Sequence, residues 1–325
     1  MTTSAIRTCF LLCALGTLTV SMKPVLEVPE ADITNGLVHA HLYLPDAENG
    51  YYRGTRFDWS GVVASLEYKG HTYHGKWFDT YNPTTHDAIM GPVEEFEPLG
   101  FSEAKAGDAF VKIGIGSLTK PDEKPYSSYK TYEIANPGTW KLKKTKNQVQ
   151  YSHTLSDKNY GYDYQKTLTL TKGKPELVIT HRLKNTGSRA IETMVYNHNF
   201  FVIDQQPAGP GYTVTLPVSN LSAEGGKGVG DLVKLQDNQL VYLRDVGKRE
   251  QAYFPNLTAG KPVAYQLTVG NTKTGATVNV TGDREIAKLV FWSSSTTVCP
   301  EPYINLNVAP GKTFSWQIAY EYSLK

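Results

Sequence analysis

The stretch that decides the fold runs from residue 161 to residue 201 and reads GYDYQKTLTLTKGKPELVITHRLKNTGSRAIETMVYNHNFF. In residues 161–170 and 177–183, apolar side chains alternate with polar ones, which is the period of a half-buried β-strand. The segments 171–175 and 185–188 carry the Gly, Pro, Asn and Ser residues that favour turns. With the run at 191–201, the stretch predicts three consecutive strands arranged as an antiparallel meander.

The same alternation recurs through the rest of the chain, for example in residues 37–44, 212–216 and 313–322. No comparably long stretch has helical spacing with caps. The pattern therefore predicts an all-β protein built as an antiparallel sandwich or barrel. We expect residues 23–325 to form a single domain, because no repeat or linker divides them. The alternative is a smaller module before Pro137 and a larger one after it.

The N-terminus has the layout of a secretory signal peptide. Arg7 precedes the apolar run CFLLCALGTLTV at residues 9–20, and a polar, proline-containing segment follows. The run is shorter than the roughly 20 residues that span a bilayer. We expect residues 1–22 to be removed and the mature protein to be secreted or periplasmic, with no membrane attachment. A buried first strand is the alternative, and the mature chain would keep only Cys299.

The charge balance gives no reason to expect a nucleic-acid or anionic membrane partner, because the chain has 33 basic and 31 acidic residues. The chain is also rich in tyrosine, with 21 residues of this type. Tyrosine suits half-buried strands and presents flat, amphipathic faces against which sugar rings stack. The composition favours a neutral partner and leaves the oligomeric state open.

Two short motifs resemble a known family. The first is an Asn-His-x-Phe-Phe element that begins with Asn197 and His198. The second is a Cys-Pro-Glu segment that ends at Glu301 and is followed by a Pro-Gly turn and a terminal strand. They are similar to motifs of the aldose 1-epimerases and hexose-6-phosphate mutarotases of the galactose mutarotase-like superfamily. The resemblance implies a galactose mutarotase-like antiparallel β-sandwich (supersandwich) that binds a mono- or oligosaccharide. It also implies that His198 is the acid that protonates the ring oxygen, that Glu301 is the base, and that Asn197 lies at the site.

Residues 90–101 (MGPVEEFEPLGF) depart from that family, whose members usually supply another histidine in a His-Gly element here. Two carboxylates, Glu94 and Glu95, stand in its place and are candidate substrate-binding residues. On a strand they would point to opposite faces, so only one of them can face the cleft. A carboxylate near Glu301 would resemble the paired acids of a hydrolase. Ordinary structural acids are the alternative.

Residues 51–61 (YYRGTRFDWSG) combine arginines, an acid and aromatics, as a sugar-binding loop does. The candidates for substrate binding are Arg53, Arg56, Asp58 and Trp59. An edge hairpin in which the arginines pair with neighbouring acids is the alternative.

Four histidines are spaced closely enough to consider a metal: His39, His41, His71 and His74. No third ligand has a convincing spacing, so we expect no metal site. Anomer interconversion needs one acid and one base, so we expect no cofactor either.

The sequence therefore predicts an exported, aldose 1-epimerase-like enzyme. A polysaccharide lyase or glycoside hydrolase on a related sandwich fold is the second hypothesis. In a lyase, Tyr81, Tyr126 or Tyr129 would act as base beside Arg53 or Arg56. A non-catalytic glycan-binding module is the third.

Overall fold

The computed structural model describes residues 27–219 and 221–325, so the expected signal peptide at residues 1–22 lies outside the described residues. Regular structure in the described part is β-strand apart from one short 3-10 helix, η1 (Ile203–Gln205), and the strands pair antiparallel. Across these same residues, we find no helix with the length and apolar character needed to span a membrane. The all-β prediction is confirmed.

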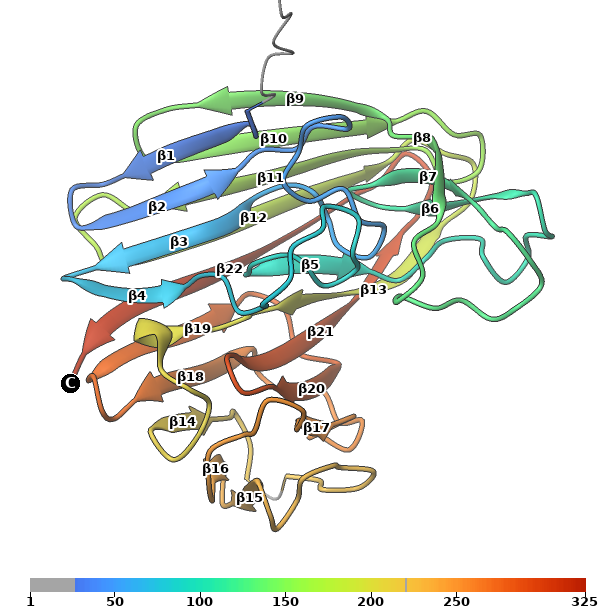
Figure 1. Ribbon diagram of the computed structural model, residues 1–325. Helices are drawn as coiled ribbons and strands as arrows, with labels where there is room; N and C mark the ends of the chain where they lie inside the picture. The colour runs from blue at the N-terminus through green and yellow to red at the C-terminus, as the bar shows by residue number, and fades with distance from the viewer. Residues whose placement is uncertain (1–26, 220) are drawn as a thin grey trace, which may run out of the picture.

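One layer is a large sheet of ten strands (Figure 1). Its strands are, in spatial order, β15 (Val233–Gln236), β16 (Gln239–Tyr242), β14 (Tyr212–Thr215), β18 (Gln266–Asn271), β19 (Ala276–Gly282), β22 (Thr313–Leu324), β12 (Glu176–Asn185), β11 (Tyr162–Leu170), β10 (Gln148–Leu155) and β9 (Thr139–Lys144). At one edge, β9 exposes Lys141, Lys143 and Lys144. Lysines on an edge strand oppose pairing with another chain.

The second layer consists of two smaller sheets that an isolated bridge between His74 and Phe201 connects. The four-stranded sheet has the order β1 (Glu30–Thr34), β2 (Val38–Tyr43), β3 (Val62–Tyr68) and β4 (His71–His74). The five-stranded sheet has the order β17 (Ala252–Phe254), β20 (Lys288–Ser293), β21 (Val298–Val308), β13 (Ile191–His198) and β5 (Val93–Phe96). Beside it lies a three-stranded sheet of β6 (Ala109–Lys112), β7 (Gly116–Thr119) and β8 (Glu133–Asn136).

The core lies between the layers. Apolar side chains of the four-stranded sheet and of β10 to β12 belong to one buried cluster, including Ile33, Leu42, Leu66, Tyr151, Leu168 and Ile179. In β12, buried residues alternate with less buried ones along most of the strand, as the sequence pattern predicts. Cys299 is a free, buried thiol in a second cluster, which also contains Phe57, Trp59 and Phe200.

The predicted meander is right for two strands and wrong for the third. β11 and β12 pair with each other, but β13 crosses to the opposite layer and pairs with β21 and β5. The Asn185 side chain supports the crossover, because its amide donates to the carbonyls of Arg189 and Val308. The alternation of apolar and polar residues shows which side chains share a face of the strand. It does not show which sheet the strand joins.

Candidate active site

The candidate site is built on one face of the five-stranded sheet. Tyr196 of β13 lies opposite Tyr303 of β21 on one side and Glu95 of β5 on the other. Residues directly opposite in an antiparallel pair share a face, as do residues two apart along a strand. The same face therefore presents His198, two residues after Tyr196, and Glu301, two residues before Tyr303.

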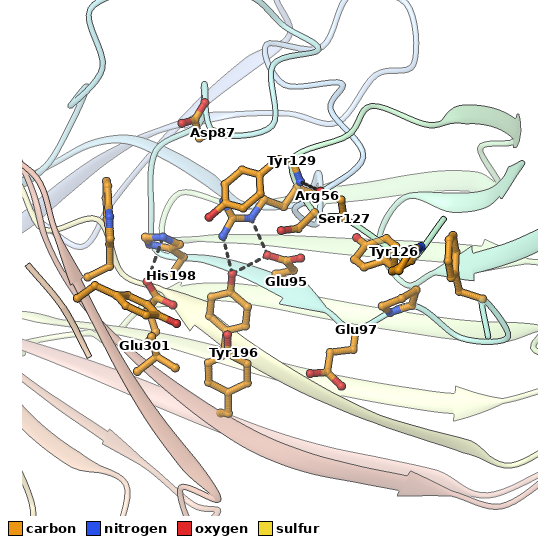
Figure 2. A pocket seen from close by; sticks show the side chains of 18 of the residues that line it. Arg56, Asp87, Glu95, Glu97, Tyr126, Ser127, Tyr129, Tyr196, His198 and Glu301 are labelled. Carbon is orange, nitrogen blue, oxygen red and sulfur yellow. Dashed lines mark hydrogen bonds and ion pairs between the residues drawn. The ribbon is translucent and has the colours of Figure 1, made fainter. Parts of the chain in front are cut away.

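A cleft of about 1170 Å³ lies over this face, and Figure 2 shows how its side chains point inward. Its floor comes from the strands. Its walls come from residues 120–129, from the loops that carry Arg56 and Trp77, and from the segment around Tyr253. Of the nine residues that the sequence nominates for the site, four line this cleft: Arg56, Glu95, His198 and Glu301.

His198 and Glu301 face each other on the floor. The imidazole Nε2 lies 3.2 Å from Oε1 of Glu301, and the two side chains are only 4% and 6% exposed. The Phe200 ring stacks on the imidazole with 3.7 Å between ring centroids, and Trp292 meets it edge-on. Phe200 has a φ of +38°, which is uncommon for a bulky residue, and this turn after β13 brings its ring back over His198. The pair is therefore held in an aromatic, water-poor setting.

Burial moves both members of the pair toward their neutral forms. It raises the pKa of Glu301 to about 8, and the charges of Arg56 and Lys288 oppose this shift. It lowers the pKa of His198 well below 6.5, and Arg56 adds to that effect. Near neutral pH the pair therefore holds one proton, with the carboxylic acid of Glu301 facing a neutral imidazole.

Glu95 is the centre of a second cluster beside the pair. Its Oε2 accepts hydrogen bonds from Arg56 Nε at 2.7 Å and from the Tyr196 hydroxyl at 2.5 Å. Its Oε1 lies 3.4 Å from Nζ of Lys112, which is fully buried and also contacts the Tyr126 hydroxyl. Burial alone would raise the pKa of Glu95, but Lys112 and Arg56 outweigh it and lower that pKa. Glu95 is thus a fixed anion that orients the Arg56 guanidinium.

The two neighbouring glutamates point to opposite faces, as the sequence predicts. Glu94 has no exposure and lies between the sheets, where it contacts Lys166 of β11, His181 of β12 and Asn197 of β13. Asp58 joins the same buried cluster, because its carboxylate lies 3.7 Å from Lys166 Nζ. The side chains of Glu94, Asn197 and Asp58 are therefore core groups, and none of them lines the cleft.

Two further nominated residues also lie outside the cleft. Trp59 is 2% exposed in the core, where its indole donates to the Gly54 carbonyl. Arg53 turns toward the surface and donates to the Glu48 carbonyl. Asp58 and Trp59 fold inward, where their polar atoms find partners, and composition alone cannot separate such residues from those of a ligand-binding loop.

Of the tyrosines and histidines considered from the sequence, some line the cleft and others lie outside it. Tyr126 and Tyr129 line the cleft, whereas Tyr81 stacks on Tyr51 elsewhere on the surface. His39 and His41 lie near the side chains of Asp32 and Glu30 on the outer strands. Within residues 27–219 and 221–325, no group of three or more His, Cys, Asp or Glu side chains is arranged to hold a metal ion.

Several residues of the site were not predicted from the sequence. Tyr196, Tyr303, Lys288 and Trp292 line the cleft, and Lys112 contacts Glu95 from below the surface. Tyr196 and Tyr303 could have been predicted, because they lie two positions from His198 and Glu301 along their strands and so share a face with them. Lys112 gave no such signal, since it comes from a strand of a different sheet.

Comparison with solved structures identifies the architecture. The chain is similar to a galactose mutarotase related enzyme from Lactobacillus acidophilus, with a TM-score of 0.54 and 13% identity over 90% of this chain and 97% of that one. It is equally similar to a galactose mutarotase-like protein from Lactobacillus casei, with a TM-score of 0.54 and 14% identity over 90% of this chain and 100% of that one.

A GalM/aldose epimerase homologue from C. elegans gives a TM-score of 0.52 and 12% identity over 91% of this chain and 99% of that one. No protein-family model matches the sequence, and no curated protein sequence matches it. At these low identities the likeness concerns the fold. It confirms the fold that the resemblance of the two motifs implies. The chain therefore has the galactose mutarotase-like fold.

Proposed function

We propose that the protein is an exported aldose 1-epimerase-like enzyme, which interconverts the anomers of a reducing sugar through His198 and Glu301. The observation that carries the proposal is the 3.2 Å contact between these two buried side chains on the floor of the cleft. The fold supports the proposal, because solved structures with the mutarotase-like fold include a protein described as an aldose epimerase homologue.

The chemistry requires two neighbouring proton-transfer groups. One removes the proton of the anomeric hydroxyl and the other protonates the ring oxygen, so that the ring opens to the carbonyl form and recloses on either face. Both oxygens are bonded to the same carbon. Groups that act on them together must therefore lie side by side, as His198 and Glu301 do.

The pair also carries the correct number of protons. The exchange takes one proton from the sugar and returns one, so the pair must hold a single proton before and after the reaction. The raised pKa of Glu301 and the lowered pKa of His198 supply that state near neutral pH. With the proton on Glu301, the acid protonates the ring oxygen while His198 Nε2 takes the anomeric proton. The resemblance implies the opposite placement, and both give the same net exchange.

Arg56 is a cation close enough to the pair to stabilise the charge that develops on the sugar oxygens. Glu95 and Tyr196 fix its guanidinium, which is 12% exposed in the side chain. A fixed charge in a buried site stabilises a developing anion more strongly than a solvated one does. Arg56 is thus preorganised beside the pair.

The competing chemistries fit the cleft less well. A lyase of the predicted kind needs a tyrosine that gives up its proton, and burial raises the pKa of Tyr126, one of the two candidate bases that line the cleft. The hydrolase considered from the sequence pairs Glu301 with Glu95, but Arg56, Tyr196 and Lys112 already engage both oxygens of Glu95.

The test is anomer equilibration of common aldoses, followed by polarimetry or NMR. The variants His198→Ala and Glu301→Gln should lose the acceleration. The controls His39→Ala and Glu67→Gln change matched residue types on the four-stranded sheet and should keep it. No acceleration by the wild-type protein would sink the proposal, and saturable sugar binding in that case would indicate a glycan-binding module. Unsaturated products or new reducing ends from a polymer would indicate a lyase or a hydrolase.

Export is part of the proposal and has its own test. Expression in a bacterial host with a periplasm, followed by intact mass measurement, should give a mature chain that has lost about the first 22 residues. A full-length mass in the cytoplasmic fraction would contradict export and leave the epimerase proposal untouched.

A further inference from the structure

The cleft is larger than one sugar needs. Its volume of about 1170 Å³ exceeds the range of about 300–1,000 Å³ that holds drug-sized ligands, and a single hexose is smaller than such a ligand. In Figure 2, His198 and Glu301 lie at one end of the view, while Glu97 and Tyr126 lie at the other, beyond Arg56. A sugar ring bound at the pair therefore leaves a continuous stretch of cleft for further units.

The wall of this stretch is the segment 124–129, which carries one highly exposed aromatic ring. Tyr129 is 67% exposed, although it lines the cleft. The His86 ring meets it edge-on with 5.0 Å between centroids, and the Arg56 guanidinium carbon lies 5.3 Å from its centre. A large aromatic ring that is held in place and left open to solvent is a typical surface for covering a ligand.

The segment that carries Tyr129 is held by its own contacts. The Tyr132 hydroxyl donates to the Ser127 carbonyl and accepts from the Ser127 amide, and Lys130 pairs with Asp122 at 3.0 Å. Tyr126 stacks on Tyr132 with an interplanar angle of 6°. Because the wall is ordered before any ligand arrives, binding costs little conformational entropy.

The charges along this stretch are mixed. Lys124 and Lys120 line it together with Glu97 and Glu123. Such a wall offers hydrogen-bond donors and acceptors without a net attraction for a polyanion. It suits a chain of hydroxyl groups better than a chain of carboxylates.

We propose that the ligand of this cleft is a neutral oligosaccharide. Its reducing-end unit lies at His198 and Glu301, and the following units extend along residues 124–129, with Tyr129 as the platform for one of them. The placement of the reducing end rests on the proposed function. The extended binding does not, so the two are separable by experiment.

The experiment is calorimetric titration of the whole mature protein with glucose, galactose, maltotriose, cellotriose and β-1,4-linked galactotriose, and with trigalacturonic acid as the anionic counterpart. The same ligands are titrated into Tyr129→Ala, into the conservative variant Tyr129→Phe, and into Tyr81→Ala. Tyr81 is a matched control, because it is also an exposed, stacked tyrosine and lies outside the cleft.

We expect at least one neutral trisaccharide to bind the wild-type protein about tenfold or more tightly than its monosaccharide. Tyr129→Ala should bring that ratio toward one, whereas Tyr129→Phe and Tyr81→Ala should keep it. Equal affinities for monosaccharides and all trisaccharides, a ratio that survives in Tyr129→Ala, or a preference for trigalacturonic acid would each overturn the proposal. If the epimerase proposal alone is wrong, no sugar is equilibrated faster, but the trisaccharide preference and its loss in Tyr129→Ala remain.

Discussion

His198 and Glu301 occupy opposite positions on adjacent antiparallel strands, with Nε2 and Oε1 3.2 Å apart and almost no exposure to solvent. In such a buried position a charge on either group is costly. A single proton held on Glu301 leaves both groups uncharged. The contact thus links the position of two strands to the protonation state that the proposed reaction needs.

The pH dependence of anomer interconversion should reflect this shared proton. After subtraction of the spontaneous rate, kcat/KM should fall as the pH rises above about 8, because Glu301 then loses the proton that the pair must hold. The acidic limb should lie below pH 6.5, where His198 gains a second proton. A kcat/KM that keeps increasing through pH 8 would contradict this assignment.

Glu301→Gln should stabilise the protein while it removes activity. The unfolded chain ionises Glu301 above its usual pKa of 4.5, whereas the folded protein keeps the proton until about pH 8. Between these values the folded state binds more protons, so the wild-type protein loses stability as the pH rises, by up to about 1.4 kcal/mol per pH unit. Glutamine has no proton to lose.

Denaturant unfolding of Glu301→Gln and wild type at pH 4.5, 6 and 8 measures this effect. The advantage of the variant should grow with pH and reach on the order of a few kcal/mol. The surface variant Glu67→Gln should show no such trend. A difference that is constant or shrinks across the range would mean that Glu301 is ionised in the folded protein.

Arg56→Met should move the basic limb of the pH profile to higher pH. The guanidinium lowers the pKa of Glu301, so its removal leaves burial and the Glu95 charge to raise that pKa further. Arg56→Lys keeps the charge and should shift the limb less. An unshifted limb in Arg56→Met, measured on kcat/KM, would argue that Arg56 has no electrostatic influence on the pair.

Lys166→Met should be strongly destabilising for a reason unrelated to the cleft. Lys166 is fully buried between the sheets, and its ammonium group neutralises Glu94 and lies near Asp58. Removal of one partner from a buried ion pair costs about 3–5 kcal/mol. Denaturant unfolding measures the loss, with the exposed Lys172→Met as control, and a loss below about 1 kcal/mol would refute the structural role.

Much of the fold could be predicted from the sequence because alternation is a local signal. The pattern at residues 161–170 and 177–183 gives β11 and β12 nearly residue for residue. The partner of β13 was not predictable in the same way, because a strand's pattern shows its buried face and not its neighbour.

The site was predictable only where residues of known chemistry fall at fixed positions on strands. His198 and Glu301 meet because of the register between β13 and β21, and the Glu94-Glu95 pair divides between two faces because strands alternate. Asp58 and Trp59 gave a misleading signal. Their polar atoms are satisfied inside the core by Ser60, Tyr164 and the Gly54 carbonyl, and partners as distant in sequence as Tyr164 leave no local pattern.

NMR exchange at neutral pH measures the rate of anomer interconversion of a reducing sugar by wild type, His198→Ala and Glu301→Gln, and so tests directly whether this pair is catalytic. We expect clear acceleration by the wild-type protein and a loss of about a hundredfold or more in each variant. A wild-type rate equal to the spontaneous rate, or variants as fast as wild type, would contradict it.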